Sequence, residues 1–145
     1  MGRLLRERLD ARVAMIGAES ERPIVEAAAG QAGAGTAVGL RLPEVARLIG
    51  KARVFAGTDS GPAHIADAMG TPGAIVYAPH KGLDRQIAKW KPEGPGYLAF
   101  TPSRDCGECR ERPCSLARQQ ECAASISVAD VFEGLRGLLS GRGEP

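Results

Sequence analysis

A polar turn at residues 58–64, TDSGPAH, holds the side chains with the clearest capacity for chemistry. It follows a short apolar run that stops at Gly57. Asp59 or Ser60 can accept hydrogen bonds from the first backbone N–H groups of a helix, and Pro62 suits a first helical turn, where its missing N–H costs nothing. We therefore expect a strand to end here and a helix to begin.

Such a turn can bind an anion. It directs several unpaired N–H groups and the positive end of the helix dipole at one spot, which suits a phosphate group. Neighbouring hydroxyl, carboxylate and imidazole groups can hold a sugar or orient the ligand. Ordinary helix capping uses the same residue types, so both interpretations stay open. The candidate binding residues are Thr58, Asp59, Ser60, Gly61 and His64.

Hydrophobic spacing predicts the elements around this turn. Strands that alternate with helices of about ten residues indicate an α/β fold with a parallel sheet and helices on both faces. Ligands bind such sheets beyond the carboxyl ends of the strands, where the polar turn would lie. The predicted helices cover residues 1–10, 21–32 (capped by Ser20), 43–51, 60–70 and 128 onward, and the predicted strands cover 13–16, 36–38, 54–57 and 74–77.

A resemblance to a known family sharpens this prediction. The segment TDSGPAHIADAMGTPGAIVYAP, residues 58–79, resembles the donor-site signature of glycosyltransferase family 9, the lipopolysaccharide heptosyltransferase family. Residues 42–57 and the cysteine-rich segment after Asp105 are similar to the family as well. Nine matches fall in fixed spacing, at Asp59, Ser60, Gly61, Pro62, His64, Ala66, Ala68, Gly70 and Pro72.

The resemblance implies the C-terminal, donor-binding half of a GT-B glycosyltransferase. Residues 1–102 would form a partial Rossmann-like domain that binds a nucleotide-sugar, and residues 103–145 a cysteine-rich segment and a helix that pack on the same domain. The polar turn would contact the sugar and diphosphate of an ADP-heptose-like donor. No further cofactor is required for the transfer.

Three residues outside the turn match family positions near the nucleotide. Leu40 corresponds to a position that packs against the base, although a core position at a loop edge explains it equally well. Glu19 and Glu21 lie where the family has an acidic residue that binds the ribose hydroxyls. Carboxylates in the first turn of a helix are also favoured by the dipole alone, so both interpretations stay open.

The resemblance covers only part of a family enzyme. Its members carry an N-terminal domain with the acceptor site and a catalytic aspartate, so we expect no catalytic residue in this chain and an inactive protein when it works alone. The acceptor domain would then be supplied by another chain or have been lost by truncation, and a glycan or lipid-linked molecule would be the acceptor. The alternative is a non-catalytic module that binds a nucleotide or a metal. Residues 80–97 depart from the family, which leaves the identity of the donor open.

All four cysteines lie close together, in the pattern C-x2-C-x4-C-x7-C. In a cytoplasmic chain such clustering favours a metal over disulfides, and tetrahedral zinc is the simplest candidate. An iron–sulfur site or unligated thiols are the alternatives. The candidate ligands are Cys106, Cys109, Cys114 and Cys122.

Length, composition and charge limit the classes of protein to which this chain can belong. The chain has 145 residues, 43% of them hydrophobic, which suffices for one ordinary domain. A net charge of +2 gives no general case for binding nucleic acid. No apolar run approaches the roughly 20 residues that span a bilayer. We therefore expect a cytoplasmic protein, with the inner face of the membrane as a peripheral location.

Overall fold

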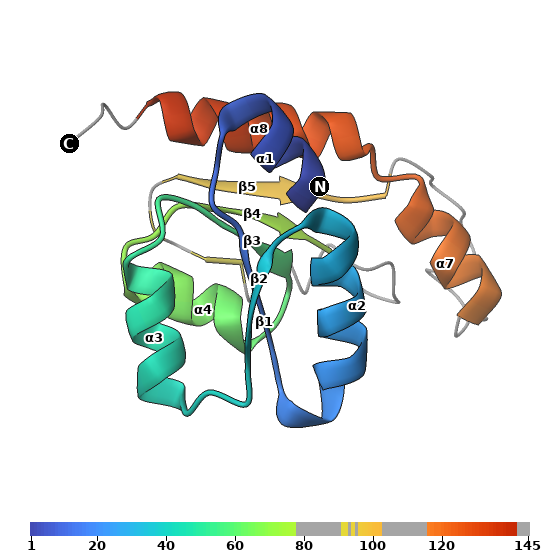
Figure 1. Ribbon diagram of the computed structural model, residues 1–145. Coiled ribbons are helices and arrows are strands. Elements are labelled where there is room, and N and C mark those ends of the chain that lie inside the picture. Colours follow the sequence, from blue (N-terminus) through green and yellow to red (C-terminus); the bar gives the residue numbers. More distant parts are fainter. Residues whose placement is uncertain (78–90, 93, 95, 103–115, 142–145) are drawn as a thin grey trace. The chain divides into compact units, whose positions relative to one another are not determined.

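The computed structural model describes residues 1–77, 91, 92, 94, 96–102 and 116–141. The chain divides into two compact units, residues 1–48 and residues 49–145 (Figure 1). Every strand pair in the described ranges is parallel, and helices connect or cover the strands. This confirms the predicted α/β class.

The first unit consists of a strand–helix–strand motif preceded by a helix. Strands β1 and β2 pair in parallel, with Ala14 opposite Gly35 and Gly17 opposite Val38. The glycine Gly33 has a φ of 61° and ends the connecting helix, so that the chain can turn back into β2. The elements are α1 (Gly2–Leu9), β1 (Ala14–Gly17), the 3-10 turn η1 (Glu19–Glu21), α2 (Arg22–Ala32), β2 (Gly35–Val38) and the start of α3 (Leu42–Gly50).

Helix α1 packs on the connecting helix through a few small contacts. Leu5 and Ala32 are buried, and Arg6 Nη1 donates a hydrogen bond to the Ala32 carbonyl oxygen over 3.1 Å. This bond satisfies one of the carbonyl groups that the end of a helix leaves without an intrahelical partner.

The predicted cap at Ser20 is wrong. Ser20 lies within the 3-10 turn, and Glu21 Oε2 accepts a hydrogen bond from the Ala18 N–H over 2.8 Å. The Glu21 carboxylate closes the 3-10 turn on the N–H that precedes it, and α2 begins at Arg22 without a side-chain cap.

The second unit is a three-stranded parallel sheet in the order β3-β4-β5. Strand β4 lies in the centre, with Thr58 opposite Val76 on one side and Tyr97 opposite Gly73 on the other. The sequence analysis did not predict β5 or α7. The described elements are β3 (Phe55–Thr58), α4 (Gly61–Ala68), β4 (Gly73–Val76), β5 (Tyr97–Phe100), α7 (Leu116–Ala124) and α8 (Val128–Ser140).

Helices cover both faces of this sheet, as predicted (Figure 1). On one face, Ala63 of α4 packs with Ile75 and Tyr77 in a buried cluster that Phe55 and Tyr97 extend. On the other face, α8 lies so close to β5 that a side-chain carbon at Gly134 would come within 2.8 Å of Leu98 and Phe100. The central strand is therefore buried on both sides, as its apolar sequence requires.

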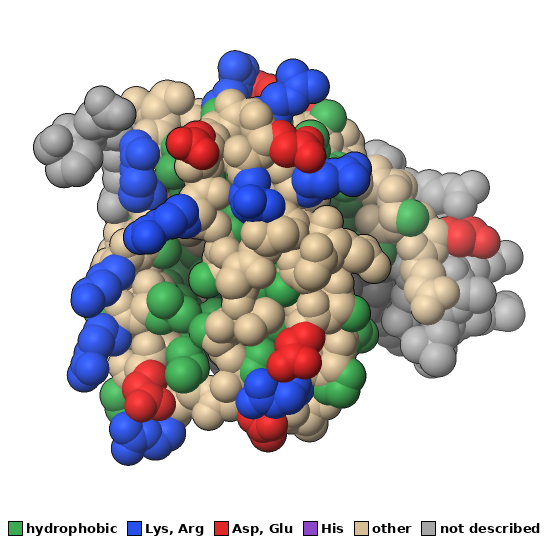
Figure 2. All heavy atoms as spheres, viewed as in Figure 1, with side chains coloured by type: hydrophobic (Ala, Val, Ile, Leu, Met, Phe, Trp, Pro, Cys, Tyr) green, Lys and Arg blue, Asp and Glu red, His purple; other side chains and the backbone are tan. Residues whose placement is uncertain are grey.

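Charged side chains of both signs lie on the surface (Figure 2). Several form exposed ion pairs along helices, such as Arg41 with Glu44 and Arg136 with Glu133. Exposed pairs of this kind contribute little to stability. None of the described helices combines the length and the apolarity that a membrane crossing requires.

Candidate functional site

The polar turn lies at the carboxyl end of β3, where the sequence predicted it. Strand β3 ends at Thr58, and α4 begins only three residues later at Gly61. Asp59 and Ser60 form the bend between the two elements and are both half-buried. The five residues predicted for the turn are therefore brought together, with His64 exposed on α4. None of these findings includes a ligand, so their binding roles stay predictions.

The Ser60 side chain does not perform the expected capping. Ser60 has an extended backbone, with φ −156° and ψ 170°, and it occupies the position before α4. Its hydroxyl donates instead to the Thr58 carbonyl oxygen over 3.1 Å. Among the described residues, no N–H group of α4 donates a hydrogen bond to the Ser60 hydroxyl oxygen.

The first turn of α4 carries the positive end of the helix dipole, and the Ser60 hydroxyl does not cap it. It contains no acidic residue, and Pro62 has no N–H. The Ala63 N–H is satisfied by the Ser60 carbonyl oxygen over 2.9 Å, which leaves the Gly61 N–H at the head of the helix. Helix dipoles favour anions at such positions.

Gly61 leaves room for a ligand to approach the backbone. A side-chain carbon at this position would meet no described atom within 4 Å. Packing against the described residues therefore does not demand a glycine here. Glycine is the residue that lets a backbone come closest to a ligand, and this is the second feature that favours anion binding.

In the first unit, the structure brings Glu19 and Gly39 together at the carboxyl ends of β1 and β2. The Glu19 carboxylate occupies the space that a side chain at Gly39 would need, and Leu40 follows directly, 36% exposed. Gly39 has a φ of 71°, and its N–H donates to the Gly17 carbonyl oxygen over 3.1 Å. The predicted base and ribose positions thus belong to one edge of this unit.

Both carboxylates predicted for the ribose have partners in the structure. Glu19 accepts two hydrogen bonds of 2.7 Å from the Arg22 guanidinium, which holds the pKa of this carboxyl below its usual range. Glu21 accepts the Ala18 N–H. A ribose would have to share Glu19 with Arg22, and the site is compatible with that because a carboxylate accepts about four hydrogen bonds.

The cysteine cluster falls largely outside the described residues. Cys106, Cys109 and Cys114 lie there, while Cys122 is buried on α7 at 3% exposure. Within the described ranges, no three His, Cys, Asp or Glu side chains come together as a metal site would require. The zinc site therefore stays a prediction.

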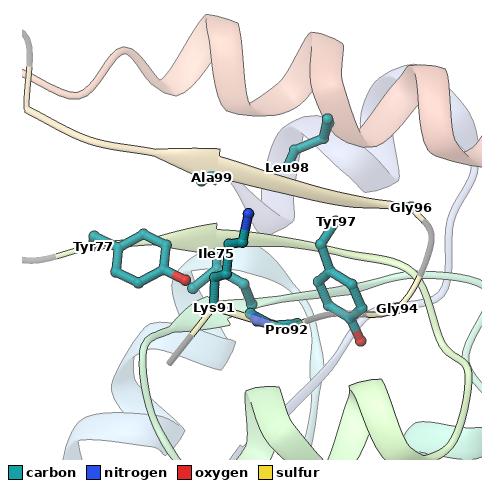
Figure 3. Close-up of a pocket in the computed structure, with 9 residues that line it drawn as sticks. All are labelled: Ile75, Tyr77, Lys91, Pro92, Gly94, Gly96, Tyr97, Leu98 and Ala99. Atoms are coloured by element: carbon teal, nitrogen blue, oxygen red, sulfur yellow. The ribbon is translucent and has the colours of Figure 1, made fainter. Parts of the chain in front are cut away.

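A cavity of about 440 Å3 beside β4 and β5 was not predicted from the sequence (Figure 3). Tyr77 and Tyr97 line it together with Ile75, Lys91 and Pro92. Tyr77 directly follows β4, so it lies beside the turn that follows β3. An aromatic residue with a polar tip at the end of a buried strand was the signal that could have indicated it.

Comparison with known proteins gives a family match that includes the polar turn at residues 58–64. The sequence matches the family model described as glycosyltransferase family 9 (heptosyltransferase) over residues 5–119. The crystal structure of a family 9 glycosyl transferase from Veillonella parvula DSM 2008 superposes with a TM-score of 0.71 and 17% sequence identity. At that identity the likeness shows the fold alone. Among curated protein sequences, none matches this chain.

The superposition covers 93% of this chain but 38% of the Veillonella protein. The chain thus spans well under half the length of that structural neighbour.

Proposed function

Because the chain belongs to glycosyltransferase family 9, we propose that it binds the nucleotide-diphosphate-sugar donor of a glycosyl transfer reaction. The observation that supports this most strongly is the turn at residues 58–64, which lies inside the family match and at the carboxyl end of β3. In parallel sheets ligands bind at this edge.

The proposal gives the turn a defined chemical task. In the transfer, an acceptor hydroxyl oxygen attacks the anomeric carbon, the bond from that carbon to the diphosphate oxygen breaks, and its electron pair leaves with the diphosphate. The Gly61 N–H and the dipole of α4 would stabilise the growing negative charge. Asp59 would accept hydrogen bonds from sugar hydroxyls, and His64 would donate to a phosphate oxygen.

A second task, removal of the proton from the acceptor hydroxyl, needs a general base. We assign that base and the acceptor site to an acceptor domain outside these 145 residues. An ADP-heptose-like donor and a lipopolysaccharide-type or other glycan acceptor complete the proposal, together with a location in the cytoplasm or at the inner face of the membrane.

Calorimetric titration of the full chain with ADP, UDP and GDP tests the donor site. We expect one nucleotide to bind saturably and His64→Ala to weaken its binding. Asp59→Ala should weaken binding of the sugar conjugate of that nucleotide. Asp130→Asn is the matched control, because it removes an acidic residue from the first turn of α8 in the same unit. A folded chain that binds none of the three nucleotides would overturn the proposal.

A further inference from the structure

The cavity beside β4 and β5 is built from elements that are held in place. The wall that contains Gly94 and Tyr97 is tied to the rest of its unit by two hydrogen bonds. The Gly94 N–H donates to Asp67 Oδ1 over 2.9 Å, and the Tyr97 hydroxyl donates to the Thr71 carbonyl oxygen over 2.6 Å. A volume of about 440 Å3 falls within the range of roughly 300–1,000 Å3 typical of small-molecule sites.

The two tyrosines that line this cavity differ in one respect. The Tyr97 hydroxyl is used by the fold, since it donates to Thr71. The Tyr77 side chain is 1% exposed, and its hydroxyl oxygen has no hydrogen-bond partner among the described residues. A buried hydroxyl without a partner costs free energy, so a protein gains by leaving one only where another molecule completes the bond.

The Tyr77 hydroxyl is directed at the cavity. In Figure 3 it points toward Ile75 and Lys91, and all three residues line the space. Burial and the negative charge of Asp59 both raise the pKa of Tyr77, so the hydroxyl keeps its proton at neutral pH and can donate it. Lys91 is exposed at the same cavity and adds a positive charge.

The remaining walls combine apolar and polar surface. Ile75, Pro92 and Ala99 line the space together with the tyrosine rings, and Gly94 and Gly96 add backbone to it. The tyrosine rings suit a flat aromatic body, and the hydroxyl donor and the ammonium group suit a single anionic group on that body.

We infer that this cavity is a second small-molecule site, which binds an aryl phosphate or aryl carboxylate with its anionic oxygen between the Tyr77 hydroxyl and the Lys91 ammonium group. The site adjoins the polar turn at residues 58–64, since the charge of Asp59 acts on the Tyr77 hydroxyl, but none of the residues that line it belongs to that turn. Its recognition group is the hydroxyl that the fold itself leaves unused.

Ligand-observed NMR titration of the full chain with phenyl phosphate and with benzoate tests this site. We expect both to bind, and inorganic phosphate and benzyl alcohol to bind less well, because each offers only half of the recognised chemistry. Tyr77→Phe should weaken binding of phenyl phosphate roughly tenfold, since it removes one hydrogen bond to a charged group. Lys91→Met should weaken phenyl phosphate but not benzyl alcohol.

Thermal unfolding of the same variants separates a binding role from a structural one. Tyr77→Phe should leave the midpoint unchanged or raise it, because it removes a buried hydroxyl that lacks a partner. Tyr97→Phe is the matched control and should lower the midpoint, because it deprives the Thr71 carbonyl oxygen of its donor.

Three results would overturn the inference. The first is that neither phenyl phosphate nor benzoate binds the folded chain. The second is equal affinity of phenyl phosphate for Tyr77→Phe and the unaltered chain. The third is a loss of stability in Tyr77→Phe as large as that in Tyr97→Phe. Nucleotide titration of Tyr77→Phe keeps this outcome separate from the donor site, because we expect unchanged nucleotide binding.

Discussion

Helices α4 and α8 both begin after a serine with extended backbone, but the two serines make opposite hydrogen bonds. Ser127 Oγ accepts from the Asp130 N–H over 3.2 Å and so caps α8. Ser60 Oγ donates backward to the Thr58 carbonyl oxygen over 3.1 Å. The start of α8 also has the acidic residue Asp130, whereas the first turn of α4 has none.

The difference shows at which helix start the protein's own side chains satisfy the N–H groups and balance the helix dipole. At α8, a side-chain oxygen and a carboxylate balance the N–H groups and the dipole, which is the ordinary structural arrangement. At α4, the Ser60 hydroxyl does not cap the helix and the first turn holds no acidic residue, and the glycine at its first position leaves the approach open. The start of α4 is therefore the one of the two that suits an external anion.

The largest effect is expected from Ser60→Asp. A carboxylate at this position would cap α4 and repel a diphosphate at the same spot. We expect nucleotide affinity to fall at least roughly tenfold, because two like charges about 4 Å apart cost several kcal/mol at the dielectric of a protein surface. Calorimetric titration measures the affinity, and unfolding in urea should show equal or greater stability. Affinity within twofold of the unaltered chain would contradict the comparison.

Gly61→Ala should weaken nucleotide binding less, by about fivefold. The added methyl group meets no described atom, so it should not disturb the fold, but it would stand where a phosphate approaches the backbone. Helix propensity favours alanine, and stability should stay equal or rise by less than about 1 kcal/mol. A variant that loses stability and keeps its affinity would show that the glycine serves packing instead.

The two capping positions should differ in stability when each serine is replaced by alanine. Ser127→Ala should reduce the free energy of unfolding by about 1 kcal/mol, as lost caps usually do. Ser60→Ala should cost less than half of that, because its hydroxyl caps nothing in the described structure. Urea unfolding of both variants gives the comparison directly, and equal losses would refute it.

The smallest effect is expected at the turn after β1. Glu21→Gln keeps an oxygen that can accept the Ala18 N–H, whereas Glu21→Ala removes it. Because Glu21 is exposed, we expect both variants to stay within about 0.5 kcal/mol of the unaltered chain, with Glu21→Ala the less stable. A larger loss in Glu21→Ala would mean that this carboxylate is as important as the cap of α8.

The sequence predicted the fold wherever its pattern was strong. The run from β3 through α4 to β4 was predicted because turn residues, an apolar helix face and Gly70 at the helix end all agree. Gly70 has the positive φ of 68° expected of a glycine after a helix. Strand β5 was missed because it has only four residues and follows a stretch rich in glycine and proline.

The sequence predicted where the residues of the candidate site lie in the fold, but not which atoms their side chains contact. Residue types placed Thr58, Asp59 and Gly61 at the carboxyl end of a strand, which the structure bears out. Side-chain direction was not predictable, because a serine hydroxyl can donate backward as easily as it can accept forward. Tyr77 was missed for a related reason: only the packed structure shows whether a buried hydroxyl has a partner.

The most direct test of the central claim is an amide NMR titration of the full chain with the nucleotide that binds. If the diphosphate lies at the start of α4, the N–H resonances of Gly61 and Ala63 should shift most, and those of Val128 and Ala129 at the capped start of α8 should stay in place. Equal shifts at both helix starts, or saturable binding without any shift at Gly61, would contradict the account.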